Sequence, residues 1–243
     1  MRPNCTATEE GEDKGMNKVV RNIRRVDPAI VKGYETLGVA TVHEAQGRKG
    51  LLAPNMRPIW KRAHIAGPAV TVEVAPCDNW MIHVAVEQCK PGDVMVVAPT
   101  SYSDAGYFGE LIATSLVAHG VVGLILDAGC RDVREIEDMQ FPVWSKAVFA
   151  QGTVKETLGN VNTPVVCAGQ TIYPGDLIVA DDDGVVVVRK DEAKAVLEAS
   201  VAREAKEAQS RKRLKAGELS IDINKMREKL KEKGLVYVDS ESE

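Results

Sequence analysis

The chain has 243 residues, of which 44% are hydrophobic and 27% are charged, and its formal net charge at pH 7 is −4. This length and composition fit one globular domain with a terminal appendage. A net negative charge offers no broad attraction to phosphate backbones or to anionic lipid, so nucleic acid and membrane surfaces are not expected partners.

The sequence also predicts where the protein works. No apolar run approaches the ~20 residues that cross a bilayer, and the first residues lack the hydrophobic region of a signal peptide, so we expect a cytoplasmic protein. The five cysteines are an odd number without a C-x-x-C pair, which indicates free thiols rather than a disulfide framework or a thiolate zinc site. They are Cys5, Cys77, Cys89, Cys130 and Cys167.

Composition divides the chain into three parts. Residues 1–15 are polar and acidic without aliphatic periodicity, so we expect them to be disordered. Residues 16–190 alternate between strand and helix patterns and form the expected catalytic domain. Residues 191–243 are rich in Ala, Glu, Lys and Leu, which predicts an arm of exposed helices that packs on a neighbouring subunit.

Two short helices are predicted near the start of the domain. The segment 28–48 has a helical pattern that is interrupted at Gly38. Pro28 suits the first turn of the first helix, where its missing N–H is not needed. Thr41 is the expected N-cap of the second helix.

A β-rich centre follows. Six runs of β-branched and apolar residues, most of them bounded by Gly, Pro or Asp, predict strands over 69–75, 93–98, 121–127, 142–148, 176–180 and 184–188. Helices are predicted between them, one capped by Asp78 and one over 108–120 that ends at Gly120. This order predicts an α/β sandwich with mixed sheets rather than a regular doubly wound fold.

The last two strands are predicted to form a hairpin. Its turn is Asp181-Asp182-Asp183-Gly184, in which the acidic residues and the glycine favour turn geometry. Three aspartates also suggest a metal site, but a calcium loop needs alternate ligands and a later glutamate, which are absent here. The sequence therefore favours an ordinary turn.

The segment 101–132 carries the residues best suited to chemistry. A glycine-containing loop leads into a helix, the helix leads into a strand, and the strand ends at Arg131-Asp132. Arg131 offers a planar fork for a carboxylate or an oxyanion, and Asp132 offers a hard oxygen ligand for a divalent ion. The alternative is a local salt bridge that caps the next helix.

The first backbone N–H groups of the preceding helix lack intrahelical acceptors and can bind a carboxylate. They belong to Gly109, Glu110, Leu111 and Ile112.

These motifs resemble a known family. FGELI followed by VVGLILDAGCRD is similar to the proteins related to the regulator of ribonuclease activity A, the RraA-like family, and within it to the 4-hydroxy-4-methyl-2-oxoglutarate and 4-carboxy-4-hydroxy-2-oxoadipate aldolases. That family is marked by an acidic residue, twenty intervening residues and Arg-Asp. Glu110 and Arg131-Asp132 satisfy this spacing, with Glu in place of the more usual Asp. The likeness extends from about residue 19 to about residue 210.

The resemblance implies a fold and an assembly. The expected fold is a β/β/α three-layer sandwich of the swivelling-domain type with a C-terminal helical arm. The expected assembly is a homo-oligomer, a trimer or a hexamer, with active sites between subunits. Glu204 and Glu207 lie on the arm, where one carboxylate can reach the metal site of a neighbour, and Glu207 is the preferred candidate. Solvated helix charges are the alternative explanation.

The resemblance also implies an activity. We expect a class II aldolase, dependent on Mg²⁺ or Mn²⁺, that cleaves 4-carboxy-4-hydroxy-2-oxoadipate or 4-hydroxy-4-methyl-2-oxoglutarate to release pyruvate in bacterial aromatic catabolism, and that also decarboxylates oxaloacetate. Asp132 would hold the metal, and the amides near Leu111 and Ile112 would bind the substrate carboxylate. Arg131 would stabilise the developing charge, and a water held by Glu110 would transfer the proton.

The resemblance leaves two alternatives to an aldolase. The first is a protein inhibitor of a ribonuclease, which needs no catalysis. A methyltransferase is disfavoured because no glycine-rich strand–loop–helix for the cofactor is visible. The four histidines show no metal-binding spacing, so packing roles outside the active site are expected for them. They are His43, His64, His83 and His119.

Overall fold

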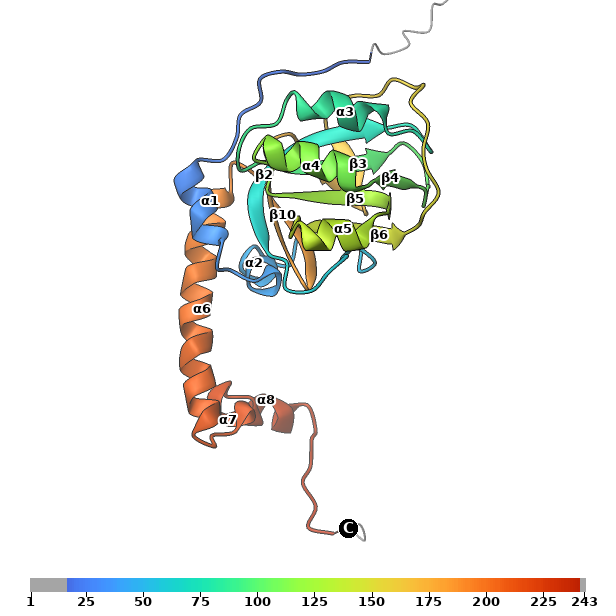
Figure 1. Ribbon diagram of the computed structural model, residues 1–243. Helices are drawn as coiled ribbons and strands as arrows, with labels where there is room; N and C mark the ends of the chain where they lie inside the picture. The colour runs from blue at the N-terminus through green and yellow to red at the C-terminus, as the bar shows by residue number, and fades with distance from the viewer. Residues whose placement is uncertain (1–16, 241–243) are drawn as a thin grey trace, which may run out of the picture.

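A computed structural model describes residues 17–240, so the predicted disordered segment 1–15 lies outside the described residues. The domain is built on one mixed sheet of eight strands in the order β1-β6-β5-β3-β2-β9-β10, with β4 paired to β5 (Figure 1). Neighbouring strands among β2, β3, β5 and β6 run parallel, whereas β9 pairs antiparallel with both β2 and β10. Two short strands, β7 and β8, form a separate hairpin.

The strands are β1 Arg57–Pro58, β2 Ile65–Val74, β3 Val94–Pro99, β4 Gly106–Phe108, β5 Gly123–Cys130, β6 Val143–Val148, β7 Val165–Cys167, β8 Gln170–Ile172, β9 Leu177–Asp181 and β10 Gly184–Val188. The helices are α1 Pro28–Tyr34, α2 Val39–Ala45, α3 Trp80–Val86, α4 Glu110–Ala118, α5 Val133–Asp138, α6 Ala193–Lys215, α7 Ser220–Ile223 and α8 Arg227–Glu232. The six predicted strands and both interleaved helices are therefore confirmed, within a few residues at their ends.

Hydrophobic side chains form a core on both faces of the sheet. In β5, Leu124 and Leu126 pack toward α3, α4 and α5, whereas Ile125 packs with Trp144 and Ile178 on the opposite face. This alternation follows from the two-residue period of a strand. A third cluster joins α1, α2 and α6 to β9 and β10. Burying one such large side chain contributes about 1.5–3 kcal/mol. The predicted α/β sandwich is confirmed.

The sheet also curves toward closure. Leu51, just before β1, forms an isolated antiparallel bridge with Val186 of β10, and the Leu52 N–H donates to the Val185 carbonyl at 3.0 Å. These contacts join the segment before β1 to β10, which are at the two edges of the sheet. The inner face is thereby enclosed, which is why its side chains are almost fully buried.

The second N-terminal helix is capped differently from the prediction. Thr41 lies inside α2, and the N-cap is Gly38, which has no side chain to accept a hydrogen bond. Asp181, from the β9–β10 hairpin, supplies the missing acceptor, because its Oδ2 accepts from the Val39 N–H at 2.8 Å. Its Oδ1 accepts from the Asp183 N–H at 2.8 Å. The turn prediction for this hairpin is confirmed, and its first aspartate also caps a distant helix.

Helix α6 begins against the domain and then leaves it. Ala193 and Val196 are buried, and the Tyr34 hydroxyl donates to the Ala193 carbonyl at 2.6 Å. Ser200 is also buried, and Arg203 lies 3.9 Å from Glu44 of α2. The C-terminal part of α6 projects away and carries α7 and α8 (Figure 1). Large apolar side chains at the end of this arm, such as Val236 and Tyr237, are exposed in the single chain. Within residues 17–240, no helix is long and apolar enough to cross a membrane.

Replacing Asp181 with alanine is expected to lower the free energy of unfolding by about 1–2 kcal/mol, because α2 loses its only side-chain cap and the hairpin loses a turn bond. Denaturant unfolding followed by circular dichroism measures this change. Asp183→Ala is the matched control, since its carboxylate accepts neither bond. Equal losses in the two variants would contradict the proposed capping.

Candidate active site

A cleft of about 160 Å³ opens where β4, β5 and three helices meet. Five of its lining residues were predicted from the sequence: Gly109, Leu111, Ile112, Arg131 and Asp132. The others belong to α3 and its N-cap, to β4 and to the segment 152–155: Asn79, His83, Gly106, Tyr107, Gly152, Thr153 and Lys155. The structure therefore joins the two polar turns of the segment 101–132 in one cleft.

Strand pairing brings those two turns together. Strand β4 runs parallel to β5 with Phe108 opposite Cys130, and the Arg131 N–H donates to the Phe108 carbonyl at 2.9 Å. The chain leaves both strands at the same edge. Gly109 and Asp132 therefore follow paired strand ends and lie side by side.

Asp132 connects these neighbouring turns. Its Oδ2 accepts a hydrogen bond from the Glu110 N–H at 3.1 Å, and it lies 3.8 Å from the Arg131 Nε. Its backbone has a φ of 56°, in the left-handed region. Asp132 also occupies the N-cap position of α5, but its side chain makes no capping bond there. The ion pair of the alternative explanation is thus present, but its capping role is wrong, because this carboxylate binds the start of α4.

This contact leaves part of the α4 N-terminus free for a ligand. The Glu110 N–H is used by Asp132, and the Ala113 N–H donates to the Gly109 carbonyl at 3.1 Å. The N–H groups of Leu111 and Ile112 fall in the first helical turn, which has no intrahelical acceptors, and both residues line the cleft. The positive end of the helix dipole favours an anion at this position.

Two predicted site residues lie elsewhere. The Glu110 side chain accepts from the Thr114 hydroxyl at 2.8 Å along α4 and does not line the cleft. Glu207 forms an ion pair with Arg203 at 2.9 Å on α6, on the opposite side of the molecule from β4 (Figure 1). Within one chain, Glu110 thus contributes only its backbone, and a role for Glu207 needs a second copy, so both side-chain roles remain predictions.

Helix α3 provides a wall that the sequence analysis did not assign to the site. Asn79 and His83 both line the cleft, contrary to the expectation that no histidine enters the site. Burial, and then the positive charge of Lys155, lower the pKa of His83. The sequence signal for this wall was the four-residue spacing between Asn79 and His83, which places two polar side chains on one face of a predicted helix.

Asp78 holds the segment that carries Lys155 against α3. The Asp78 side chain is buried and accepts from the backbone N–H groups of Trp80, Glu156 and Thr157 at 2.9, 2.7 and 2.8 Å. Burial raises the pKa of this carboxyl, but the three backbone donors together lower it more, and its pKa lies below the ordinary value of 3.8. The N-cap of α3 is Asn79, one residue after the predicted Asp78, but the Asp78 carboxylate does accept from the first N–H of the helix and also anchors one wall of the cleft.

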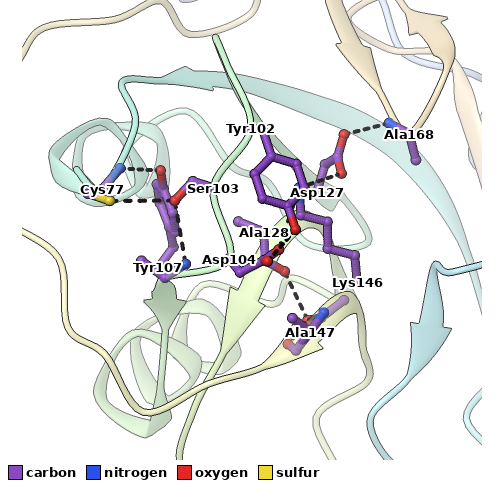
Figure 2. Close-up of polar contacts among 12 residues, drawn as sticks. Cys77, Tyr102, Ser103, Asp104, Tyr107, Asp127, Ala128, Lys146, Ala147 and Ala168 are labelled. Atoms are coloured by element: carbon purple, nitrogen blue, oxygen red, sulfur yellow. Dashed lines mark hydrogen bonds and ion pairs between the residues drawn. The ribbon is translucent and has the colours of Figure 1, made fainter.

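Tyr107 fixes the floor of the cleft from β4. Its hydroxyl donates to the Ala75 carbonyl at 3.1 Å. It also accepts from the Cys77 N–H, a bond that Figure 2 shows beside Ser103. Burial raises the pKa of Tyr107. The phenol therefore stays neutral and structural at pH 7.

A largely buried lysine holds the loop before β4. The Lys146 side chain is only 9% exposed and lies 3.5 Å from Asp127 and 3.9 Å from Asp104, over the ring of Tyr102 at 4.2 Å (Figure 2). Asp127 also accepts from the Ala168 N–H at 2.7 Å. These contacts fix the course of the chain that leads into the cleft.

The donor set of the cleft fits a hydrated divalent ion. Among the described residues, no group of three or more His, Cys, Asp or Glu side chains is arranged to hold a metal. Mg²⁺ keeps several waters and commonly binds through one or two carboxylates and its substrate. Asp132, whose side chain is 41% exposed, can provide one carboxylate of such a set.

Fold and cleft together define an α/β protein with a cleft at paired strand ends, lined by Arg131, Asp132 and the first turn of α4. The family model RraA-like: Aldolase/RraA matches residues 39–187. The chain therefore belongs to the RraA-like family, as the motifs around Glu110 and Arg131-Asp132 predicted.

Individual relatives carry two kinds of name. A Halalkalibacterium halodurans protein provisionally named 4-hydroxy-4-methyl-2-oxoglutarate aldolase is 29% identical over 176 residues, covering 72% of this chain and 84% of the relative. A Burkholderia multivorans protein with the same provisional name is 31% identical over 157 residues, covering 63% and 95%. The structure of Streptomyces coelicolor RraAS2, described as an unusual member of the RNase ES inhibitor RraA family, has a TM-score of 0.70 and 26% identity, covering 78% and 99%.

Gly109→Ala tests the contact between Asp132 and α4. An added Cβ would lie 2.2 Å from the Asp132 Oδ2, so the carboxylate would have to leave the Glu110 N–H. We expect a loss of about 1 kcal/mol in the free energy of unfolding. In an Asp132→Ala background the same change should cost less, because the contact is already gone. Equal costs in the two backgrounds would rule out this coupling.

Asp78→Asn tests the anchor by its pH dependence. Because the folded pKa is depressed, the stabilisation by Asp78 is fully present above the unfolded pKa near 4 and is lost as the pH falls through the folded value. The variant should lose about 1–3 kcal/mol at pH 7. In denaturant titrations, the difference in the free energy of unfolding between the variant and wild type should become smaller below pH 4. Asp138→Asn, on the exposed side of α5, is the control. If the loss of stability in Asp78→Asn did not depend on pH, the result would contradict this account.

Proposed function

We propose that this protein is a pyruvate-releasing, metal-dependent aldolase that acts on 4-hydroxy-2-oxo acids with a carboxylate at C4, as in 4-carboxy-4-hydroxy-2-oxoadipate, with 4-hydroxy-4-methyl-2-oxoglutarate as a second substrate. One observation carries the proposal. Arg131 and Asp132 share a single cleft with the free amides at the start of α4. The provisional aldolase names of two relatives support it.

The reaction sets the demands on the cleft. The C4 hydroxyl loses its proton and becomes a carbonyl as the C3–C4 bond breaks. The bonding electrons move to the pyruvate fragment as an enolate, and protonation at C3 then gives pyruvate. Negative charge therefore develops at the 2-oxo oxygen, where fixed cationic donors lower the barrier most.

The residues of the cleft match these demands. The Leu111 and Ile112 amides bind the C1 carboxylate, and the guanidinium of Arg131 stabilises the charge at the 2-oxo oxygen. Asp132 would hold Mg²⁺ or Mn²⁺ beside them. A divalent ion supplies Lewis acidity for the same oxygen when it is bound. Decarboxylation of oxaloacetate passes through the same enolate, so we infer it as a second activity.

Assembly is part of the proposal. A trimer or hexamer would let the arm of one subunit approach the cleft of another, where Glu207 would add a second carboxylate near Asp132. The alternative is a protein inhibitor of a ribonuclease. The exposed apolar side chains at the end of the arm and the similarity to RraAS2 favour that alternative as a second candidate.

A coupled assay of pyruvate release tests the activity. Purified protein is given each hydroxylated substrate and oxaloacetate, before and after chelation, with Mg²⁺ or Mn²⁺ added back. We expect pyruvate from all three, loss on chelation and recovery with the ion. Inactivity on all three together with tight binding of a ribonuclease would favour the inhibitor.

Arg131→Ala is expected to lower kcat about 10²–10³-fold, the usual effect of removing a donor to a developing oxyanion. Arg131→Lys should recover little, because an ammonium lacks the planar fork. Arg134→Ala, on the exposed side of α5, is the matched control and should retain wild-type rates. Full activity in Arg131→Ala would overturn the mechanism.

A further inference from the structure

The proposed cleavage needs a group that takes the proton of the C4 hydroxyl, and most polar side chains near the cleft are committed elsewhere. The Glu110 carboxylate accepts along its own helix and lies outside the cleft. The Tyr107 hydroxyl is bonded on both sides to backbone groups. Arg131 and Lys155 are cations that only donate. Asp132 is bonded to the start of α4 and is the proposed metal ligand.

His83 is the remaining side chain in the cleft that can accept a proton. It lies in the second turn of α3, where the backbone N–H is bonded within the helix, and it lines the cleft. The residue is exposed, and neither of its ring nitrogens has a hydrogen-bond partner among residues 17–240. The rings of the other three histidines, in contrast, are each bonded to a backbone carbonyl: His43, His64 and His119. Both nitrogens of His83 are therefore available to a ligand.

The imidazole is also in the right protonation state. Partial burial, and then the positive charge of Lys155, lower the pKa of His83 below its ordinary value of 6.5, so the ring is mostly neutral at pH 7. The titratable side chains around it come from the other walls of the cleft and from α3 itself: Arg131, Asp132, Tyr107, Lys155 and Glu87. A neutral imidazole is the commonest general base in enzymes.

We propose that His83 is the general base of the retro-aldol step and takes the C4 hydroxyl proton on a ring nitrogen. This inference rests on the proposed aldolase function. As the proton moves to the ring, the C4 oxygen becomes a carbonyl, the C3–C4 bond breaks and its electrons pass to the enolate of pyruvate. The imidazolium then gives the proton to C3 of the enolate, which completes pyruvate and returns His83 to its neutral form.

Oxaloacetate separates this role from a general structural one. It has no C4 hydroxyl, and the same enolate forms when CO₂ leaves, so its decarboxylation needs no base. The enolate can take its proton from water. Loss of His83 should therefore impair the cleavage of hydroxylated substrates much more than the decarboxylation of oxaloacetate.

His83→Gln and His83→Ala provide the test. We expect kcat for retro-aldol cleavage to fall about 10²-fold or more, the usual contribution of a general base, with decarboxylation within about threefold of wild type. Imidazole added to the buffer should partly restore cleavage by His83→Ala, which a merely structural role would not allow. In the wild type, cleavage should decline as the pH falls below 6.5 and the ring gains a proton, whereas decarboxylation should not follow this decline.

His119→Gln is the matched control. His119 is an exposed histidine at the end of α4, is bonded to the Ser115 carbonyl at 2.8 Å and does not line the cleft. Its replacement should leave both activities unchanged. Full cleavage activity in a His83 variant, equal losses of both activities in a folded one, or a wild-type pH profile without the decline would overturn the assignment. A wild-type protein that is inactive on every substrate would instead overturn the aldolase function on which it rests.

Discussion

The hydrogen bond from the Glu110 N–H to the Asp132 carboxylate is the contact on which the cleft depends. It joins the start of α4 to the end of β5, and it exists only because Gly109 has no side chain between them. With this bond in place, Arg131 and the two free amides of α4 lie on one cleft. Without it, the two turns would be paired only through the short strand β4.

The remaining walls are held by groups that take no part in chemistry. Asp78 anchors the segment that carries Lys155, Tyr107 is bonded through both its ring hydroxyl and its carbonyl, and Lys146 fixes the chain before β4. Each of these supporting side chains is mostly buried. Rigid support of this kind keeps donors and acceptors in place before a ligand binds, which lowers the cost of ordering them on binding.

Charge in the cleft is distributed for a polyanionic ligand. Arg131, Lys155 and the N-terminal dipole of α4 are positive, and Asp132 is the one carboxylate among the described residues that lines the cleft. Burial, and then the charge of Lys155, lower the pKa of His83. A small acid with several carboxylates suits this balance better than a neutral metabolite. The basic side chains and exposed apolar residues of the arm, in contrast, suit a contact with protein, which is consistent with an oligomer.

Most of the fold could be predicted from local pattern. The β-branched runs, the hairpin around Asp181 and the helix that ends at Gly120 depend on contacts between near neighbours in the chain, so they follow from spacing and composition. The short strands β4, β7 and β8 were missed, because three residues are too few to show an alternating pattern. The cap assigned to Thr41 was wrong, because Asp181, 142 residues from Val39, supplies the acceptor.

By itself, the sequence determined the family and the α/β architecture, and it predicted Arg131 and Asp132 as residues of one site, since motif spacing and strand periodicity are local properties. Only the tertiary structure decided that Asp132 binds the start of α4, that the Glu110 side chain turns along its own helix, and that Asn79 and His83 line the cleft. The physical reason is that a hydrogen bond is directional and short. Its partners are set by how strands and helices meet in space, which no spacing along the chain records.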